Sequence, residues 1–491
     1  MFIFLNYLIM KNPLYSALFL GLIFFVCSDK LVAQKIEPIP VKQFYKDRVT
    51  RNLQFLCKEA ECLDNVIVND KGLYIYPTSQ KVNKPEFILY WREMPHFVEM
   101  LDKKKTEEII DILSRKGSHY FYGINNTHVN PAKYPVTEYK GLKVALDPGH
   151  IASNFEEARL EQRYVRAEGK HFNQKQHIEF FESNLAYTTC LVLKEMLEKK
   201  GAHVMLTHEY GKSAMGINYN EWLQTDYKKD IIHGYKEDWY NREKFEYLMS
   251  GQAPDFMLFH DVFRNMDFVA RAKKINEYKP NITLVVHYNA SEGGKRYGDL
   301  YLPPVTENYS MVFIPGSFLG IEIDGQDGLD QRFEMLRLLV THDLEESDVF
   351  ASNIIKALND ELKVDALPKE NNFDFATRFS ILSDKSEGVY HRNLYLTRVV
   401  RGPIAYSEAL YQDNIEEMAK LGKKDFTIGG IKTSSRVKDV AHVYFSAIDQ
   451  WLQYNQQFAK QLDALYEDKY GDEDAFKEEM EKQEADSGSN N

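Results

Sequence analysis

The chain has 491 residues, of which 44% are hydrophobic and 13% aromatic. This is enough for two or three packed domains and too apolar for a disordered protein. The formal net charge is -12 and no basic stripe dominates any stretch, which argues against a nucleic-acid-binding protein.

The N-terminal segment 1–34 has the pattern of a secretory signal peptide. A basic residue at Lys11 precedes an apolar run over 14–26 and a small-residue exit near Ala33. We therefore expect an exported protein of the periplasm or cell envelope. Two alternatives stay open. An uncleaved segment would anchor the protein in a membrane, and Cys27 would carry a lipid, although its preceding residue fits such processing poorly.

Residues 35–140 are interpreted as an N-terminal accessory region. Helical periodicity over 107–123 and a short apolar run over 87–91 predict a mixture of helix and strand. The region shows no internal repeat and no catalytic signature. A polar stretch with prolines over 130–141 is predicted to be a linker to the next domain.

The cysteines give no zinc-finger pattern. Cys57 and Cys62 are candidates for a local disulfide in an exported protein, although their spacing alone leaves this open. Cys190 falls on the apolar side of an amphipathic helix pattern and is predicted to lie in the core.

From Leu142 onward the pattern alternates between strand and helix. Such alternation predicts an α/β fold, a doubly wound and mostly parallel sheet with helices on both faces, over the catalytic domain 141–465. An acidic tail over 466–491 is predicted to be disordered. The expected strands are 142–147, 202–207, 281–291 and further strand material in 393–410; the expected helices are 182–201, closed by Gly201, 269–280 and 436–465.

Two intervals, 210–268 and 301–389, interrupt this alternation. Both are aromatic and charged, and neither has a clean period. We predict that they are elaborations on the loop side of the sheet, which is the side where α/β folds bind their ligands.

Four chemically competent side chains stand where predicted strands end or helices begin. His150 follows the first strand, Glu182 opens the next helix, His287 ends a later strand, and Glu408 lies at the end of another. Each alone has a structural alternative, such as a hydrogen-bonded histidine or a helix-start acid favoured by the macrodipole. Together, two imidazoles and a carboxylate form a catalytic zinc set, and a further carboxylate supplies a general base. No Ser-His-Asp set is apparent.

The segment KVALDPGH, residues 143–150, resembles the opening signature of the zinc-dependent N-acetylmuramoyl-L-alanine amidases. The resemblance extends over 142 to about 460, and Glu161 with Arg163 resembles the Glu-x-Arg of one subgroup of this family. The further blocks follow in the order of the family: 182–207, 271–276, 285–290 and 407–414.

The resemblance implies one zinc ion and hydrolysis of the amide between N-acetylmuramic acid and the L-alanine of the stem peptide. It implies peptidoglycan as substrate and leaves a protein activator open. Related zinc hydrolysis of another envelope substrate, or a non-catalytic wall-binding homologue, are the alternatives. The implied roles are metal ligation by His150, Glu182 and His287, acid/base catalysis by Glu408, and substrate contacts by Asn289, Glu161 and Arg163.

Several positions depart from the family pattern. The glycines that usually follow the first histidine are replaced by residues 151–154, and 32 residues separate His150 from Glu182. We expect these departures to alter substrate preference and not metal binding. Asp147 is predicted to hold the first loop through bonds to the backbone. The interval 301–389 stands where some members carry an inhibitory helix, so inhibition and a cleft wall are both open interpretations.

Overall fold

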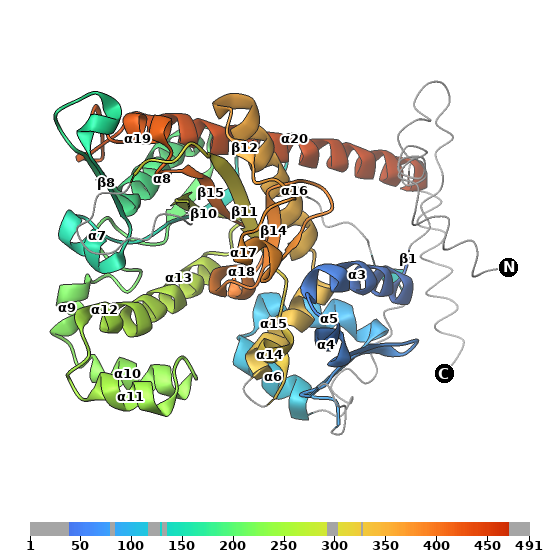
Figure 1. Cartoon of the computed structure of the whole chain (residues 1–491). Helices are drawn as coiled ribbons and strands as arrows, with labels where there is room; N and C mark the ends of the chain where they lie inside the picture. Colours follow the sequence, from blue (N-terminus) through green and yellow to red (C-terminus); the bar gives the residue numbers. More distant parts are fainter. Residues whose placement is uncertain are drawn as a thin grey trace, which may run out of the picture. The chain divides into compact units, whose positions relative to one another are not determined.

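The computed structural model describes residues 39–78, 84–115, 128–129, 135–291, 303–325 and 328–470 (Figure 1). The chain divides into a large compact unit, Ile39–Gln456, and a small one formed by Met1–Pro38 and Gln457–Asn491. The predicted signal peptide and the part of the tail beyond Tyr470 lie outside the described residues. No helix in the described part of the chain has both the length and the apolar character needed to cross a membrane.

An eight-stranded sheet forms the centre of the large unit, with the order β13-β14-β11-β15-β10-β6-β9 and β12 beside β11. Four neighbouring strands run parallel, and the predicted strands 142–147, 202–207 and 281–291 are among them. The parallel strands are β6 (Lys143–Pro148), β9 (His203–Leu206), β10 (Ile282–Asn289) and β15 (Ile404–Tyr411).

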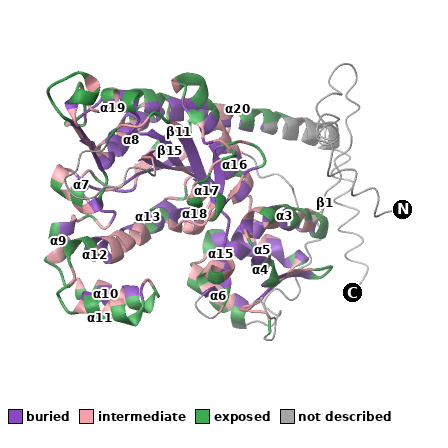
Figure 2. Ribbon diagram, viewed as in Figure 1, coloured by how far each residue is buried: buried purple, intermediate pink, exposed green. Residues whose placement is uncertain are grey.

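Helices cover both faces of this sheet (Figure 1). On one face, α8 (Glu182–Lys199) and α20 (Arg436–Tyr470) form a core with Val144 and Leu146. On the other, α13 (Arg264–Tyr278) and α18 (Tyr395–Val399) pack on Ala145. Because β6 and β10 are covered on both sides, they are apolar along nearly their whole length and buried (Figure 2). The doubly wound fold is confirmed, and Cys190 lies in the core as predicted.

Two predictions about the second half of the chain hold in part. The strand material predicted within 393–410 is present as β15, whereas the residues before it form the helical turn α18, where Thr397 Oγ1 accepts the backbone N–H of Leu394. The interval 301–389 is not only a loop-side elaboration, because it adds four strands to the sheet beyond β15. These strands are β11 (Tyr309–Ile314), β12 (Asp365–Ala366), β13 (Ser380–Leu382) and β14 (Val389–Arg392).

The N-terminal region shares one hydrophobic core with helix α15 (Leu329–Val340) of that same interval. Arg332 of α15 is fully buried and its Nε lies 2.6 Å from Glu86 Oε2. The disulfide between Cys57 and Cys62 is present in this region. The elements are α3 (Val41–Leu56), α5 (Met94–Lys103), α6 (Thr106–Arg115) and the antiparallel sheet of β2 (Val66–Val68), β3 (Gly72–Ile75) and β4 (Phe87–Tyr90).

The interval 210–268 folds into short helices with an aromatic core of their own, in which Tyr219, Trp222 and Phe263 are buried. A single π-helical turn, Phe259–Phe263, joins this helical cluster to α13. Such turns are rare in proteins overall, and those that occur are often found at functional sites. The helices are α9 (Tyr219–Leu223), α10 (Lys228–Lys236), α11 (Arg242–Met249) and α12 (Asp255–Leu258).

Candidate active site

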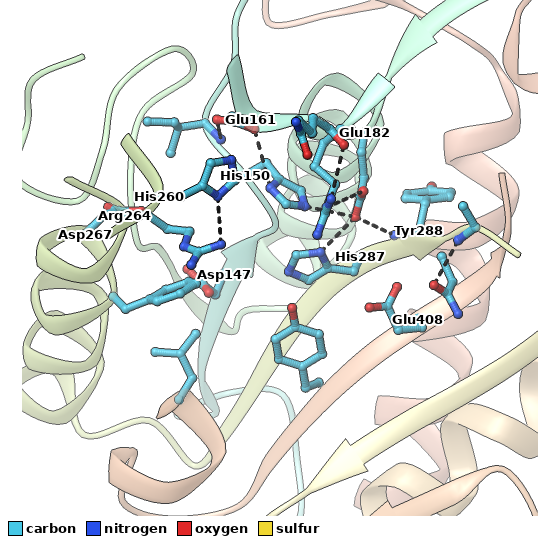
Figure 3. A pocket seen from close by; sticks show the side chains of 18 of the residues that line it. Asp147, His150, Glu161, Glu182, His260, Arg264, Asp267, His287, Tyr288 and Glu408 are labelled. Carbon is cyan, nitrogen blue, oxygen red and sulfur yellow. Dashed lines mark hydrogen bonds and ion pairs between the residues drawn. The ribbon is translucent and has the colours of Figure 1, made fainter. Parts of the chain in front are cut away.

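Three predicted metal ligands meet at the carboxyl ends of the parallel strands (Figure 3). His150 follows β6, Glu182 is the first residue of α8, and His287 lies near the end of β10. One ligand atom from each lies within 4.8 Å of the others. Glu182 Oε1 stands between the histidines, 2.8 Å from His287 Nδ1 and 3.3 Å from His150 Nε2. The carboxylate and both imidazoles therefore converge on one point.

The chemistry of this donor set fits zinc. His150 Nε2 is buried and makes no hydrogen bond to any described residue, as expected of a nitrogen kept for a metal. Burial lowers the pKa of His150 to about 3, so the imidazole is neutral and its lone pair is free. Although burial raises the pKa of Glu182, its contacts with His150 and His287 hold it well below its usual value. Two imidazole nitrogens and a carboxylate form a catalytic zinc set with one position left open.

The close approach of His287 restricts the backbone just before His150. A Cβ atom on Gly149 would lie 2.5 Å from Cε1 of His287, so only glycine fits here. The Gly149 N–H donates to the carbonyl of Val286 at 2.8 Å, which ties the two ligand segments together. His150 itself adopts a φ of 65°, a conformation that non-glycine residues rarely take and that is concentrated at functional sites.

Glu161 lies behind His150. The segment 151–154 starts helix α7 (Phe155–Glu161), whose N-cap Asn154 accepts from the Glu157 N–H at 3.0 Å. Glu161 ends this helix, is 2% exposed, and accepts the Ile151 N–H at 2.9 Å. Its other oxygen lies 3.4 Å from His150 Nδ1. The contact that the structure shows is thus with a metal ligand, and a substrate contact for Glu161 stays a prediction.

Further side chains hold the other two ligands, and the sequence alone did not indicate them. The amide nitrogen of Gln412 donates to Glu182 Oε2 at 3.3 Å and to the carbonyl of Tyr288 at 2.8 Å. The Tyr406 ring stacks on His287 with 4.6 Å between centroids. Such contacts orient the ligands of metal sites.

Glu408 is the register partner of His287 on the adjacent parallel strands β15 and β10. Partners in a parallel pair point to the same face, so this carboxyl lies beside the ligand group (Figure 3). Its Oε2 is buried and has no hydrogen-bond partner among the described residues. Burial raises the pKa of Glu408 to about 7, which suits a group that takes up and returns a proton near neutral pH.

The first loop is anchored by Arg271, and the prediction that Asp147 does so through backbone bonds is wrong. Arg271 Nη1 donates to Asp147 Oδ1 at 2.9 Å and to the carbonyl of Pro148 at 2.7 Å. Its Nε donates to Asp267 at 2.7 Å, so one buried cation serves two carboxylates and the loop. His208, which stands where the family usually has arginine, contacts the same Pro148 carbonyl through Nε2 at 3.0 Å.

A cavity of about 550 Å³ opens over these groups. Asn289 and Arg163 line it, as expected of the predicted substrate residues, whose role stays a prediction. One wall comes from the π-helical turn and the start of α13, including Phe259, His260 and Arg264. No lining residue in the described part of the chain comes from 301–389, so inhibition or a cleft wall finds no support there.

The sequence profile of the N-acetylmuramoyl-L-alanine amidase family matches residues 144–431, more than half of the chain and the part that carries this site. The chain belongs to this family. The site therefore belongs to an enzyme of the peptidoglycan amidase class. No curated protein matches the chain.

Solved structures of amidases are similar to the chain at low identity. The CwlD amidase from Clostridioides difficile, in complex with the GerS lipoprotein, shares 15% identity with a TM-score of 0.34, over 64% of this chain and 100% of that one. The catalytic domain of the amidase CwlV from Bacillus (Paenibacillus) polymyxa shares 14%, with a TM-score of 0.31, over 64% and 98%. An N-acetylmuramyl-L-alanine amidase from Mycobacterium smegmatis shares 13%, with a TM-score of 0.34, over 65% and 99%. These scores are low, and the assignment rests on the family match.

Proposed function

We propose that this amidase is an exported, zinc-dependent enzyme that hydrolyses the amide between N-acetylmuramic acid and the L-alanine of the stem peptide. The observation that carries the proposal is the convergence of His150, Glu182 and His287 within 4.8 Å, with Glu408 in the adjacent register position of the same cavity. The signal pattern at the N-terminus and the Cys57–Cys62 disulfide support export, because structural disulfides persist mainly in oxidising compartments.

His150, Glu182 and His287 would hold the zinc ion, and the ion supplies Lewis acidity that polarises the scissile carbonyl and makes water more acidic. Glu408 accepts the proton of the attacking water on its free carboxylate oxygen. It then returns that proton to the amide nitrogen, which leaves poorly unless it is protonated. A pKa of about 7 favours both halves of this exchange, because the carboxylate and the carboxylic acid are both populated near neutral pH.

The remaining residues keep the reacting groups in place. Glu161 fixes the ring of His150, and Gln412 with the Tyr288 N–H fixes Glu182. Tyr406 packs flat on His287 and limits its rotation. Positioning of this kind matters because a displacement of about 1 Å costs on the order of a hundredfold in rate.

The test is a digestion of purified cell wall with zinc-loaded wild-type protein and with Glu408→Ala, combined with metal analysis and mass spectrometry of the products. We expect free stem peptides with an N-terminal L-alanine from the wild type and at least a hundredfold slower release from the variant, with equal zinc content. Glu416→Ala, at an exposed position eight residues further on, is the matched control and should act like the wild type.

The same digestion separates the alternatives. Release of other fragments indicates a different envelope bond, and wall binding without any release indicates a non-catalytic homologue. Equal release by the wild type and Glu408→Ala refutes the assignment of the acid/base residue. A wild type that releases no stem peptides refutes the amidase activity itself.

A further inference from the structure

Arg264 is a cation in the cavity wall that the hydrolytic mechanism does not use. It is the first residue of α13, directly after the π-helical turn, and its half-buried side chain lies in the wall of the cavity (Figure 3). Arg163, two residues after the end of α7, lines the same cavity. Because both residues line the space over the ligand group, their charges act on whatever occupies that space.

The neighbour of Arg264 is a neutral histidine. Its Nη1 lies 3.0 Å from His260 Nδ1, and His260 Nε2 lies 3.2 Å from the carbonyl of Leu160. A carbonyl only accepts hydrogen bonds, so Nε2 carries the proton and Nδ1 accepts from the guanidinium. Burial, together with the charge of Arg264, lowers the pKa of His260 to about 4, which keeps the ring neutral. The neutral ring of His260 therefore orients the guanidinium of Arg264 and does not neutralise its positive charge.

Several other buried arginines of this fold, although not Arg48, are paired with carboxylates. Arg271 lies two turns further along the same helix and contacts Asp147 and Asp267, and Arg332 contacts Glu86. No carboxylate in the described ranges lies within ion-pair distance of Arg264, and its Nε is buried without a partner there. The nearest carboxylate oxygen to Arg163 belongs to Glu182 at 3.9 Å, and that residue is the expected metal ligand.

Most carboxylates on the cavity lining are engaged elsewhere, and the one that is not is the candidate acid/base residue Glu408. Asp147 and Asp267 share Arg271, Glu161 accepts a backbone N–H, and Glu182 lies between the two histidines. The cavity thus presents two cations: Arg264 has no carboxylate within ion-pair distance in the described ranges, and Arg163 has only Glu182, at 3.9 Å. Guanidinium groups bind carboxylates through paired, charge-assisted hydrogen bonds, so an anionic ligand group is the natural complement.

We propose that Arg264, together with Arg163, forms a subsite for the free carboxylate on the second residue of the stem peptide. This inference rests on the proposed function, because it takes the scissile amide to lie at the ligand group. The carboxyl of L-alanine is consumed in the next peptide bond. In a stem whose second residue is a D-glutamate linked onward through its side chain, the first free carboxylate is the α-carboxylate of that residue. A cavity of about 550 Å³ is of a size that accommodates such a segment.

The test measures binding and not turnover. Zinc-loaded Glu408→Ala protein is titrated calorimetrically with N-acetylmuramoyl-L-alanyl-D-isoglutamate and with the corresponding isoglutamine, which differ only by a carboxylate replaced with an amide. We expect the acid to bind about tenfold to a hundredfold more tightly. Adding Arg264→Gln should abolish this preference and leave the affinity for the amide unchanged. Lys273→Gln removes one positive charge from an exposed position of the same helix and should keep the preference.

Equal affinity for the two probes, a preference that survives Arg264→Gln, or no binding of either probe would overturn the subsite. If the Arg264→Gln protein loses its zinc or its fold, Arg264→Lys is used instead, because lysine keeps the positive charge and loses the paired hydrogen-bond geometry. We then expect the preference for the acid over the amide to fall by about tenfold. An unchanged preference overturns the proposal. Cell-wall digestion by the wild type is scored separately. Normal digestion with equal affinities refutes the subsite alone, whereas absent digestion refutes the amidase activity.

Discussion

Gly149→Ala should disable the metal site without touching a ligand. The new methyl carbon would lie 2.5 Å from Cε1, 2.6 Å from Nδ1 and 2.7 Å from Nε2 of His287. Carbon atoms pack at about 3.5 Å or more, so the ring has to retreat by about 0.8 to 1 Å. Metal–ligand distances tolerate about 0.2 Å, so His287 no longer reaches the ion in the same geometry. We expect zinc affinity to fall at least about a hundredfold, which is about 2.7 kcal/mol.

The assay is zinc affinity by chelator competition, followed by kcat/KM on a defined muramoyl peptide. Gly251→Ala is the control, because Gly251 has a φ of 74° and no atom within 4 Å of a new Cβ. It introduces only the cost of a left-handed residue, about 1 kcal/mol of stability, and should keep its zinc. Wild-type zinc affinity in Gly149→Ala would show that the close approach of His287 to the loop is not what positions this ligand.

Three further predictions concern the acid/base residue, the support of His150 and the N-terminal core. Because burial raises the pKa of Glu408 to about 7, the basic form is lost as the pH falls below 7, and kcat/KM should decline there; full activity at pH 5.5 would contradict this. Glu161→Ala removes the carboxyl group that lies 3.4 Å from His150 Nδ1, so chelator competition should show about 10- to 100-fold weaker zinc binding, and an unchanged affinity would speak against this role. Arg332→Met leaves Glu86 without its cation, and urea unfolding should show a loss of about 3 kcal/mol; an unshifted midpoint would show that this pair does not stabilise the shared core.

The catalytic half of the fold was predictable because its signals are local. Apart from Lys143 and Asp147, the run over 143–148 is apolar, which is typical of a strand buried on both faces, and its helix partner 182–199 has a clear apolar side. In a parallel sheet the carboxyl ends of strands meet at one edge. Residues that follow such strands, as His150 and His287 do, are therefore brought together by the topology. Their roles as zinc ligands remain a prediction that the geometry supports.

The misjudged segments are those in which local pattern and tertiary partners disagree. Residues 393–400 are apolar enough for a strand, yet the Leu394 N–H donates to Thr397 Oγ1, and residues 395–399 form a helical turn. The strand Tyr309–Ile314 lies between β15 and β14, and both of these strands come from a part of the chain far beyond residue 314. Only these neighbours distinguish a sheet strand from an apolar stretch of an insertion.

The sequence thus specified the strand–helix alternation and the four groups at the strand ends and the helix start, since each depends on spacing along the chain. Only the tertiary structure shows why position 149 must be glycine, because a Cβ atom there would meet the ring of His287. The tertiary structure also decided which supporting side chains contact those four groups. Glu161 comes to lie behind His150 because α7 ends there, and Gln412 reaches Glu182 across 230 positions of the chain. Arg264, directly after the π-helical turn, has no carboxylate within ion-pair distance in the described chain, and its Nε is buried without a partner there. Contacts between residues so far apart leave no periodic trace in a single sequence, because they arise from packing and not from local geometry.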